Sequence, residues 1–180
     1  MSALPKFSPS LALLAPIAAA VPLDSVEAAG YLKIGDIKGE SADERHKEWI
    51  EIASFSWGIE CDPEAPAGAH QHRPITITKE IDKSSPKLML ACGTGGSPTG
   101  EGTSMTLVIN DPARNNGEDY YKIEFHDVIV TSFQTGGSTA GDSVPTESVS
   151  FNYTKITWTY LPADGSDPVV VSRDFSPDPT

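Results

Sequence analysis

Ser148-Val-Ser-Phe-Asn-Tyr-Thr-Lys-Ile-Thr-Trp-Thr-Tyr160 is the longest alternating run of the chain. Its apolar side chains occupy the odd positions up to Tyr153 and the even positions after Lys155. Alternation with a period of two is typical of a β-strand that buries one face. The change of phase predicts a β-bulge near Thr154-Lys155, or a strand that is covered on both faces.

Shorter runs of the same kind lie before and after this one, separated by Gly, Pro, Asn or Asp. They are rich in β-branched and aromatic residues, which favour strands. With the first run they make about eight strands, which predict a mainly β fold: an antiparallel β-barrel or sandwich with one short α-helix. The shorter predicted strands are Tyr31–Ile37, Trp49–Trp57, Pro74–Lys79, Met105–Ile109, Tyr120–Phe125, Val128–Phe133 and Val169–Phe175.

One segment has the pattern of a helix. Ser85 can cap it, Pro86 suits the first helical position, residues 87–92 fill about two turns, and Gly93 suits the end. We expect this helix to close one end of the barrel. Its inward side chains are expected to be Leu88, Met89 and Cys92.

The composition is that of one globular domain, with 180 residues, 38% hydrophobic and 21% charged. The 25 Asp and Glu residues outnumber the 13 Lys and Arg residues, so the net charge is −12. Such a chain lacks the basic face that phosphate groups require, which argues against nucleic acid and anionic lipid as main partners. No apolar run reaches the roughly 20 residues of a membrane-spanning helix.

The first thirty residues differ from the rest. They contain an apolar stretch, Leu11–Val21, with Lys6 before it and the small residues Ala18-Ala19-Ala20 near its end. This layout predicts a cleavable secretory signal peptide at 1–30, followed by the β domain at 31–180. A flexible Ala/Pro-rich arm, and a pro-segment or docking tail, are the alternatives.

The titratable residues form no clear catalytic constellation. His70 and His72 could share a metal ion on one strand face, but no strong third ligand accompanies them, and we interpret them as part of a solvated loop at 58–73. The charge run Asp43–Glu48 is interpreted as an exposed connection with local ion pairs. His126-Asp127 has no nucleophile that can be placed beside it. The sequence therefore predicts no catalytic site, no metal site and no cofactor.

The two cysteines, Cys61 and Cys92, could form one disulfide or remain thiols. They belong to no CxxC or Cys/His zinc spacing. A domain of this length needs no covalent crosslink, so we expect two free, partly buried thiols.

Five segments in order resemble the Hcp family, the haemolysin-coregulated tube proteins of bacterial type VI secretion. The resemblance extends from residue 31 to residue 175, which is nearly the whole domain, and the strand-to-helix segment is the most specific match. The five segments are Tyr31–Ser41, Ser54–Gly58, Ile75–Cys92, Val128–Ser138 with its Thr-Gly-Gly turn, and Glu147–Tyr160.

The resemblance implies a β-barrel with one helix and a structural rather than enzymatic role. Subunits of this family join into rings of six, and the rings stack into a hollow inner tube. A contractile sheath propels the tube, which leaves the cell with the spike protein and can carry small effectors in its lumen. The implied partners are therefore further copies of the chain, the sheath, the spike and small effector proteins.

The resemblance also implies roles for particular residues. Ser56 matches the lumen-facing residue near the path of the cargo, where a small hydroxyl leaves the bore open. The loop at 58–73 occupies the place of the loop that reaches the next ring. The ring-stacking residues expected in it are Cys61, Asp62, Glu64, His70, His72 and Arg73.

The chain departs from the family pattern at its N-terminus, because family members usually begin almost directly at the first strand. Without cleavage, the protein is cytoplasmic before it is secreted with the tube. With a signal peptide, it is exported by itself and forms rings, or acts as a ligand-binding β-sandwich, outside the cytoplasm and without a sheath. In that last reading Trp49, Trp57 and Trp158 could form a stacking platform, although strand spacing more often places such residues in the core.

Overall fold

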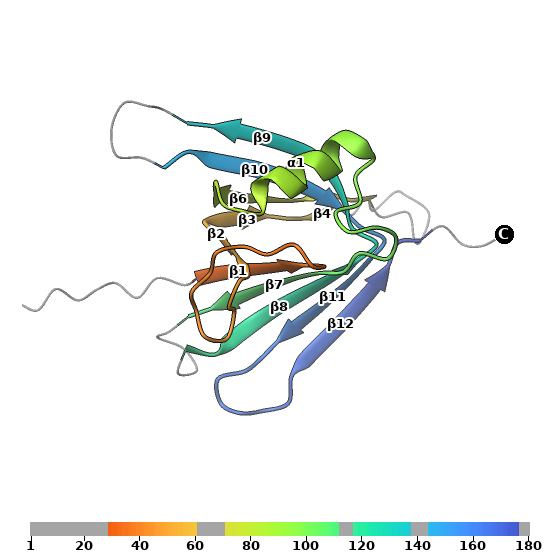
Figure 1. The fold of residues 1–180 in the computed structure, drawn as a ribbon. Helices are drawn as coiled ribbons and strands as arrows, with labels where there is room; N and C mark the ends of the chain where they lie inside the picture. Colours follow the sequence, from red (N-terminus) through yellow and green to blue (C-terminus); the bar gives the residue numbers. More distant parts are fainter. Residues whose placement is uncertain (1–28, 61–70, 112–116, 138–143, 177–180) are drawn as a thin grey trace, which may run out of the picture.

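The fold is that of a computed structural model, which describes residues 29–60, 71–111, 117–137 and 144–176 (Figure 1). Residues 1–28 of the predicted signal peptide and residues 61–70 of the loop at 58–73 lie outside the described residues, whereas Ala29 and Gly30 are the first two residues of β1. Twelve strands and one helix are present in the described part of the chain: β1 (Ala29–Ile34), β2 (Ile50–Ile52), β3 (Ser54–Ser56), β4 (Ile59–Glu60), β5 (Gln71–His72), β6 (Ile75–Glu80), α1 (Ser85–Thr94), β7 (Met105–Asn110), β8 (Asp119–His126), β9 (Ile129–Gly136), β10 (Thr146–Asn152), β11 (Lys155–Tyr160) and β12 (Val169–Asp174).

The strands form two main antiparallel sheets and a small ribbon, which confirms the predicted fold class. The larger sheet has the order β12-β11-β8-β7-β1-β2, and the smaller has the order β3-β6-β10-β9. Strands β4 and β5 pair with each other. The sheets are joined where β2 leads into β3 and where β10 leads into β11, and α1 lies against β9 (Figure 1). The most deeply buried side chains of the core are Leu32, Ile34, Ile50, Ile75, Ile77, Leu88, Met105, Leu107, Phe125, Val149, Phe151 and Ile156.

The long alternating run is two strands rather than one. Strand β10 belongs to the smaller sheet and β11 to the larger, and the chain turns between them at Tyr153-Thr154. Both apolar faces point into the same core, since Tyr153 and Ile156 are 3% and 0% exposed. The change of phase therefore marks a corner between sheets, and the predicted bulge or doubly covered strand is wrong. The predicted strand 49–57 is divided at Ala53 in the same way, into β2 and β3.

The helix lies where it was predicted, but its ends and its buried face differ. It spans Ser85–Thr94, and Gly95, whose φ of 117° suits glycine, caps its C-terminal end. Ser85 does not cap it, because its side chain turns inward. Leu88 is buried as expected, whereas Met89 is 58% exposed. Because α1 covers β9 with one face, the residue three positions after Leu88, Ala91, is buried instead.

Lys79 is the largest fully buried polar side chain of the described residues, and charged partners surround it. Its Nζ lies 2.9 Å from Oε2 of Glu147 and 2.8 Å from Oδ1 of Asp82. It also donates to Oγ of Ser85, and that hydroxyl donates to Glu147 over 2.7 Å. This buried network ties β6, β10 and the first turn of α1 together, and it gives Ser85 a structural role.

The connection between β1 and β2 is also more ordered than the charge run 43–48 suggested. His46 is only 2% exposed, and its ring stacks on Tyr31 with centroids 4.3 Å apart. Its Nδ1 lies 2.8 Å from Asp43, and its Nε2 lies 3.1 Å from Asp119 of β8. The interpretation as an exposed connection is therefore wrong for His46. Its ring can be buried because a carboxylate lies within hydrogen-bond distance of each ring nitrogen.

This arrangement predicts an acid-dependent loss of stability. The pKa of Asp43 lies below its ordinary value, because hydrogen bonds from His46 and Arg45 together outweigh the opposing effect of partial burial. A lowered pKa in the folded state stabilises the fold above the unfolded pKa of about 3.9, and this stabilisation disappears as the pH falls through the folded value. We expect Asp43→Asn to unfold more easily than the unmodified chain at pH 6, and the two to converge as the pH falls through the folded-state pKa of Asp43. Urea unfolding measured across this range tests it, and a difference that stays constant with pH would contradict it.

Candidate functional site

The outward face of the smaller sheet carries a regular array of uncharged polar side chains. Along most of its four strands, core residues alternate with outward hydroxyl or amide side chains, and the exceptions are Glu80 at the end of β6 and a bulge at Thr131 of β9. We call this array the hydroxyl face, and its members are Ser54, Ser56, Thr76, Thr78, Ser148, Ser150, Ser132 and Gln134.

Strand register arranges the hydroxyl face in two rows that cross all four strands. One row pairs Ser56 with Thr76, Thr76 with Ser150, and Ser150 with Ser132. The hydroxyls of Thr76 and Ser150 are hydrogen-bonded to each other over 2.9 Å. The second row lies beside the first, two residues away on each strand. It consists of Ser54, Thr78, Ser148 and Gln134. The face is therefore held by backbone pairing and does not depend on a loop.

A hollow of about 820 Å³ lies over the first row, and β4 forms one of its walls together with Arg73. Trp57 contributes to this wall, and its Nε1 donates a hydrogen bond to Oη of Tyr153. Burial raises the pKa of the Tyr153 hydroxyl, and the hydrogen bond from Trp57 partly offsets this. Arg73 and Glu60 form an ion pair at the rim, so that end of the hollow carries no net charge from them.

Ser56, the residue expected in the lumen, is the end member of the first row. It is exposed, it occupies the edge strand β3, and it lines the hollow. Sequence reasoning singled out Ser56 but missed the other members of the face. The signal was present, because Ile75-Thr-Ile-Thr78 and Ser148-Val-Ser150 place hydroxyls at every second position.

The ring-stacking residues fall into two groups. Cys61, Asp62, Glu64 and His70 lie outside the described residues. His72 and Arg73 are described, and His72 is not solvated as interpreted: its Nε2 lies 2.9 Å from Oδ1 of Asn152. The His72 ring also stacks on Phe175 with centroids 4.2 Å apart, because the short strand β5 carries it back against the barrel.

The tryptophans do not share one platform. Trp57 and Trp158 contact each other, with centroids 5.2 Å apart, and pack against the core. Trp49 instead meets the edge of His46 on the larger sheet. Cys92 carries a free, half-buried thiol, as expected.

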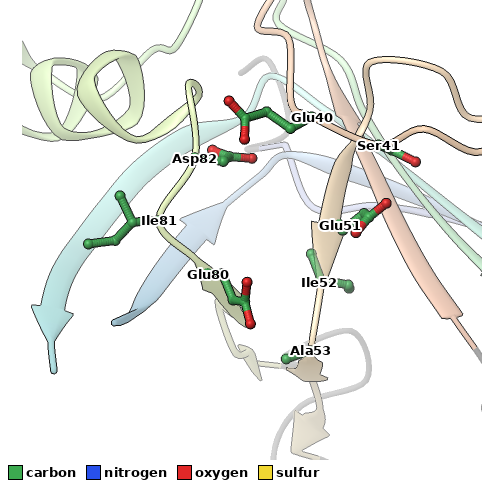
Figure 2. A pocket seen from close by; sticks show the side chains of 8 residues that line it. All are labelled: Glu40, Ser41, Glu51, Ile52, Ala53, Glu80, Ile81 and Asp82. Carbon is green, nitrogen blue, oxygen red and sulfur yellow. The ribbon is translucent and has the colours of Figure 1, made fainter. Parts of the chain in front are cut away.

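A second hollow, of about 300 Å³, lies between β2 and the end of β6 (Figure 2). Glu40 and Asp82 lie next to each other at one end, and Glu80 faces Ile52 across the gap (Figure 2). With Glu51 also in its lining, this hollow is acidic and suits a basic side chain. Within the described ranges, no group of three His, Cys, Asp or Glu residues could hold a metal ion. No helix in the described part of the chain is long and apolar enough to cross a bilayer.

The two sheets have four outer strands, β12 and β2 in the larger and β3 and β9 in the smaller. Strands β2 and β3 follow each other in the chain and meet at Ala53, whereas β12 and β9 lie at the far edges and have exposed apolar side chains on or beside them. On strand β12 of the larger sheet, we call Val169, Val170 and Val171 the valine edge; each of these side chains is 56–58% exposed. Strand β9 is the far edge of the smaller sheet. Here Ile129 and the α1 residues Met89 and Leu90 are 40–64% exposed, and we call them the helix edge. The two edges lie at opposite ends of the molecule (Figure 1).

Comparison with known proteins gives one consistent relationship. The family model described as type VI secretion system effector, Hcp, matches residues 31–160. Protein hcp1 of Pseudomonas aeruginosa is 35% identical over 144 residues, which cover 76% of this chain and 86% of that protein. The major exported protein of the same organism is 29% identical over 134 residues, covering 69% and 76%. The crystal structure of Hcp1 from Salmonella typhimurium matches with a TM-score of 0.69 and 28% identity, over 82% of this chain and 95% of that one.

Proposed function

The chain belongs to the Hcp family of type VI secretion proteins, and from this premise we propose that it is a structural subunit of the inner tube. In this proposal six copies form a ring, the rings stack, and the lumen carries small effector proteins. The tube is secreted with its contents, and its other partners are the sheath and the spike protein.

The observation that carries this proposal is the pair of open edges at opposite ends of the molecule. A closed barrel has no such edges, and exposed strand edges readily pair with another chain. Different surfaces at the two ends favour head-to-tail association, which gives a ring when the rotation closes. The valine edge of one copy is then available to the helix edge of the next, and both apolar groups leave water.

The hydroxyl face is the surface that we assign to the bore of the ring. It is polar, and it has no long side chains except Gln134. Such a face can border a water-filled channel without closing it. The acidic hollow of Figure 2 lies at the junction of the two sheets, outside this face.

Mass determination by light scattering and negative-stain electron microscopy of the purified full chain test the proposal. We expect a mass near six chains and rings with an open centre. A strict monomer at high concentration would overturn the tube function and leave only the family fold. Mass spectrometry of the secreted protein would determine its N-terminus, because loss of 1–30 indicates separate export and retention indicates export with the tube.

Ser56→Gln is expected to reduce cargo retention without affecting assembly. The longer side chain projects from an exposed position of the edge strand into the hollow, so it narrows the bore and changes no core contact. Co-purification of effectors with the assembled protein measures the effect, with Ser104→Gln, an exposed position outside the hydroxyl face, as the control. Equal cargo yields from both variants would remove Ser56 from the cargo path.

The ring-stacking role of the loop can be tested through the register of the ribbon. Glu60 and Gln71 are paired residues of β4 and β5, so replacing 61–70 by Asn-Gly joins the two strands with a two-residue hairpin turn. We expect unchanged folding and rings, because the described contacts of His72 and Arg73 remain, but loss of stacking into tubes. Tubes of normal length from this variant would refute the proposed role.

A further inference from the structure

The hydroxyl face contains no ionisable side chain in either of its two rows. This is unusual for a surface of a chain with 13 basic and 25 acidic residues. The positions of the two rows are instead occupied by serine, threonine and one glutamine. Charged groups border the rows: Glu80 is the next outward residue of β6 after Thr78, and the paired Arg73 and Glu60 lie beside the first row.

The face also lacks the groups that give strong attachment. Trp, Tyr and Arg dominate the energetics of tight protein interfaces, and none of them belongs to the rows. Each hydroxyl offers one donor and two acceptor positions, and the bond between Thr76 and Ser150 uses only part of this capacity. A neutral hydrogen bond contributes a net of about 0.5–1.5 kcal/mol, so contacts here are weak individually and add up only over several positions.

We propose that the hydroxyl face takes polypeptide cargo through uncharged hydrogen bonds, so that binding is indifferent to the sign of the cargo's charge and to salt. This inference rests on the proposed function, because it assigns a mode of recognition to the face that lines the bore. Screening by salt weakens attraction between exposed charges, and it leaves contacts between neutral groups almost unchanged. Affinity per subunit is low, and retention comes from several copies of the face around one cargo.

Surface plasmon resonance on the immobilised full chain tests the inference with three peptides of equal length. One is neutral and rich in Ser, Thr, Asn and Gln; the second and third carry added Lys or Glu. We expect millimolar dissociation constants for all three at 300 mM NaCl, and a value for the neutral peptide that changes by less than about twofold between 50 and 300 mM NaCl.

A matched pair of variants locates the binding. Thr76→Val with Thr78→Val removes two hydroxyls of the face and keeps the side-chain shape and strand preference. Thr157→Val with Thr159→Val is the control on β11, because Thr157 forms a similar cross-strand bond of 2.9 Å with Ser172. The first pair should weaken binding of every peptide at least threefold, and the control pair should not.

Three results would overturn the inference: no binding of any peptide, binding that disappears at 300 mM NaCl, or equal binding by both pairs of variants. Light scattering on the same samples measures the oligomeric state, so it distinguishes failure of this inference from failure of the tube proposal. Rings without salt-insensitive binding contradict only the inference. A monomer that binds the neutral peptide through Thr76 and Thr78 contradicts only the ring.

Discussion

Lys79→Met should lower the free energy of unfolding by about 3–5 kcal/mol, because it leaves two carboxylates in the interior without their cation. Lys79 is 0% exposed, and the side chains of Glu147 and Asp82 are 2% and 11% exposed. Solvent therefore cannot take the place of the lost ammonium group. Methionine fills a similar volume, so the effect reports the charge rather than a cavity.

Denaturant unfolding followed by tryptophan fluorescence, at a fixed protein concentration, measures this loss. Lys122→Met is the control, since Lys122 pairs with Glu124 over 3.1 Å at the surface, where both side chains are more than one third exposed. An exposed pair of this kind contributes about 0–1 kcal/mol. A Lys79 variant no less stable than the Lys122 variant would show that the buried network does not stabilise the fold.

The double variant Lys79→Met with Glu147→Leu measures the interaction energy between the two side chains, apart from the effect of removing either one alone. Removing both charges avoids most of the penalty for an unpaired buried carboxylate, so it should recover at least about half of the loss. Strict additivity of the two single changes would mean that Lys79 and Glu147 do not interact in the folded state.

The second large effect concerns assembly. Val169→Lys with Val171→Lys should prevent association through the valine edge while the monomer stays folded. The two side chains are 58% and 56% exposed, so lysine costs the monomer little. In an assembled ring, burying the part of each valine that is still exposed would contribute about 1–1.7 kcal/mol, which corresponds to roughly fivefold to twentyfold in affinity for each. Charge on an open edge also opposes strand pairing directly.

Sedimentation velocity and circular dichroism measure these two consequences together. The expected result is a folded monomer at concentrations where the unmodified chain forms rings. Glu51→Lys changes the charge by the same two units at an exposed position of β2, the outer strand opposite β12 in the larger sheet, and should assemble normally. If the double variant still forms rings, the valine edge is not the interface, and the helix edge would have to be tested by Leu90→Lys.

The first prediction concerns the stability of the single subunit, and the second concerns its assembly. The buried network joins β6, β10 and α1 and so supports the sheet that carries the hydroxyl face. The valine edge lies on the other sheet, at the opposite end of the molecule (Figure 1). A variant at Lys79 should therefore change stability before assembly, whereas a variant at the valine edge should change assembly alone.

Local pattern was enough for most of the fold. Alternation in Pro74–Lys79 and Tyr120–Phe125 predicted strands that became β6 and β8, and Pro86 marked the first turn of α1. These features depend on neighbouring residues, because side chains alternate across a strand and proline suits a helix start. The order of such segments also predicted the family.

Tertiary structure decided where the long runs divide and which polar groups are buried. A run such as 148–160 reads as one strand, since only pairing with different sheets reveals the corner at Tyr153-Thr154. His46 was interpreted as part of an exposed connection, and the sequence offered no partner for Lys79, because their partners Asp119 and Glu147 lie 73 and 68 positions away in the chain. Partners so far apart in the sequence come together only when the chain folds, and only then is the cost of burying these polar groups compensated.

The candidate site shows the same division. The sequence by itself determined that Ser, Thr and Gln occupy alternate positions in the middle of four strands, and therefore that each strand has a polar face that is uncharged over these positions. Only the register of β3, β6, β10 and β9 brings these positions into two continuous rows. Pairing of strands far apart in the chain is set by the packing of the core as a whole, and no local pattern encodes it.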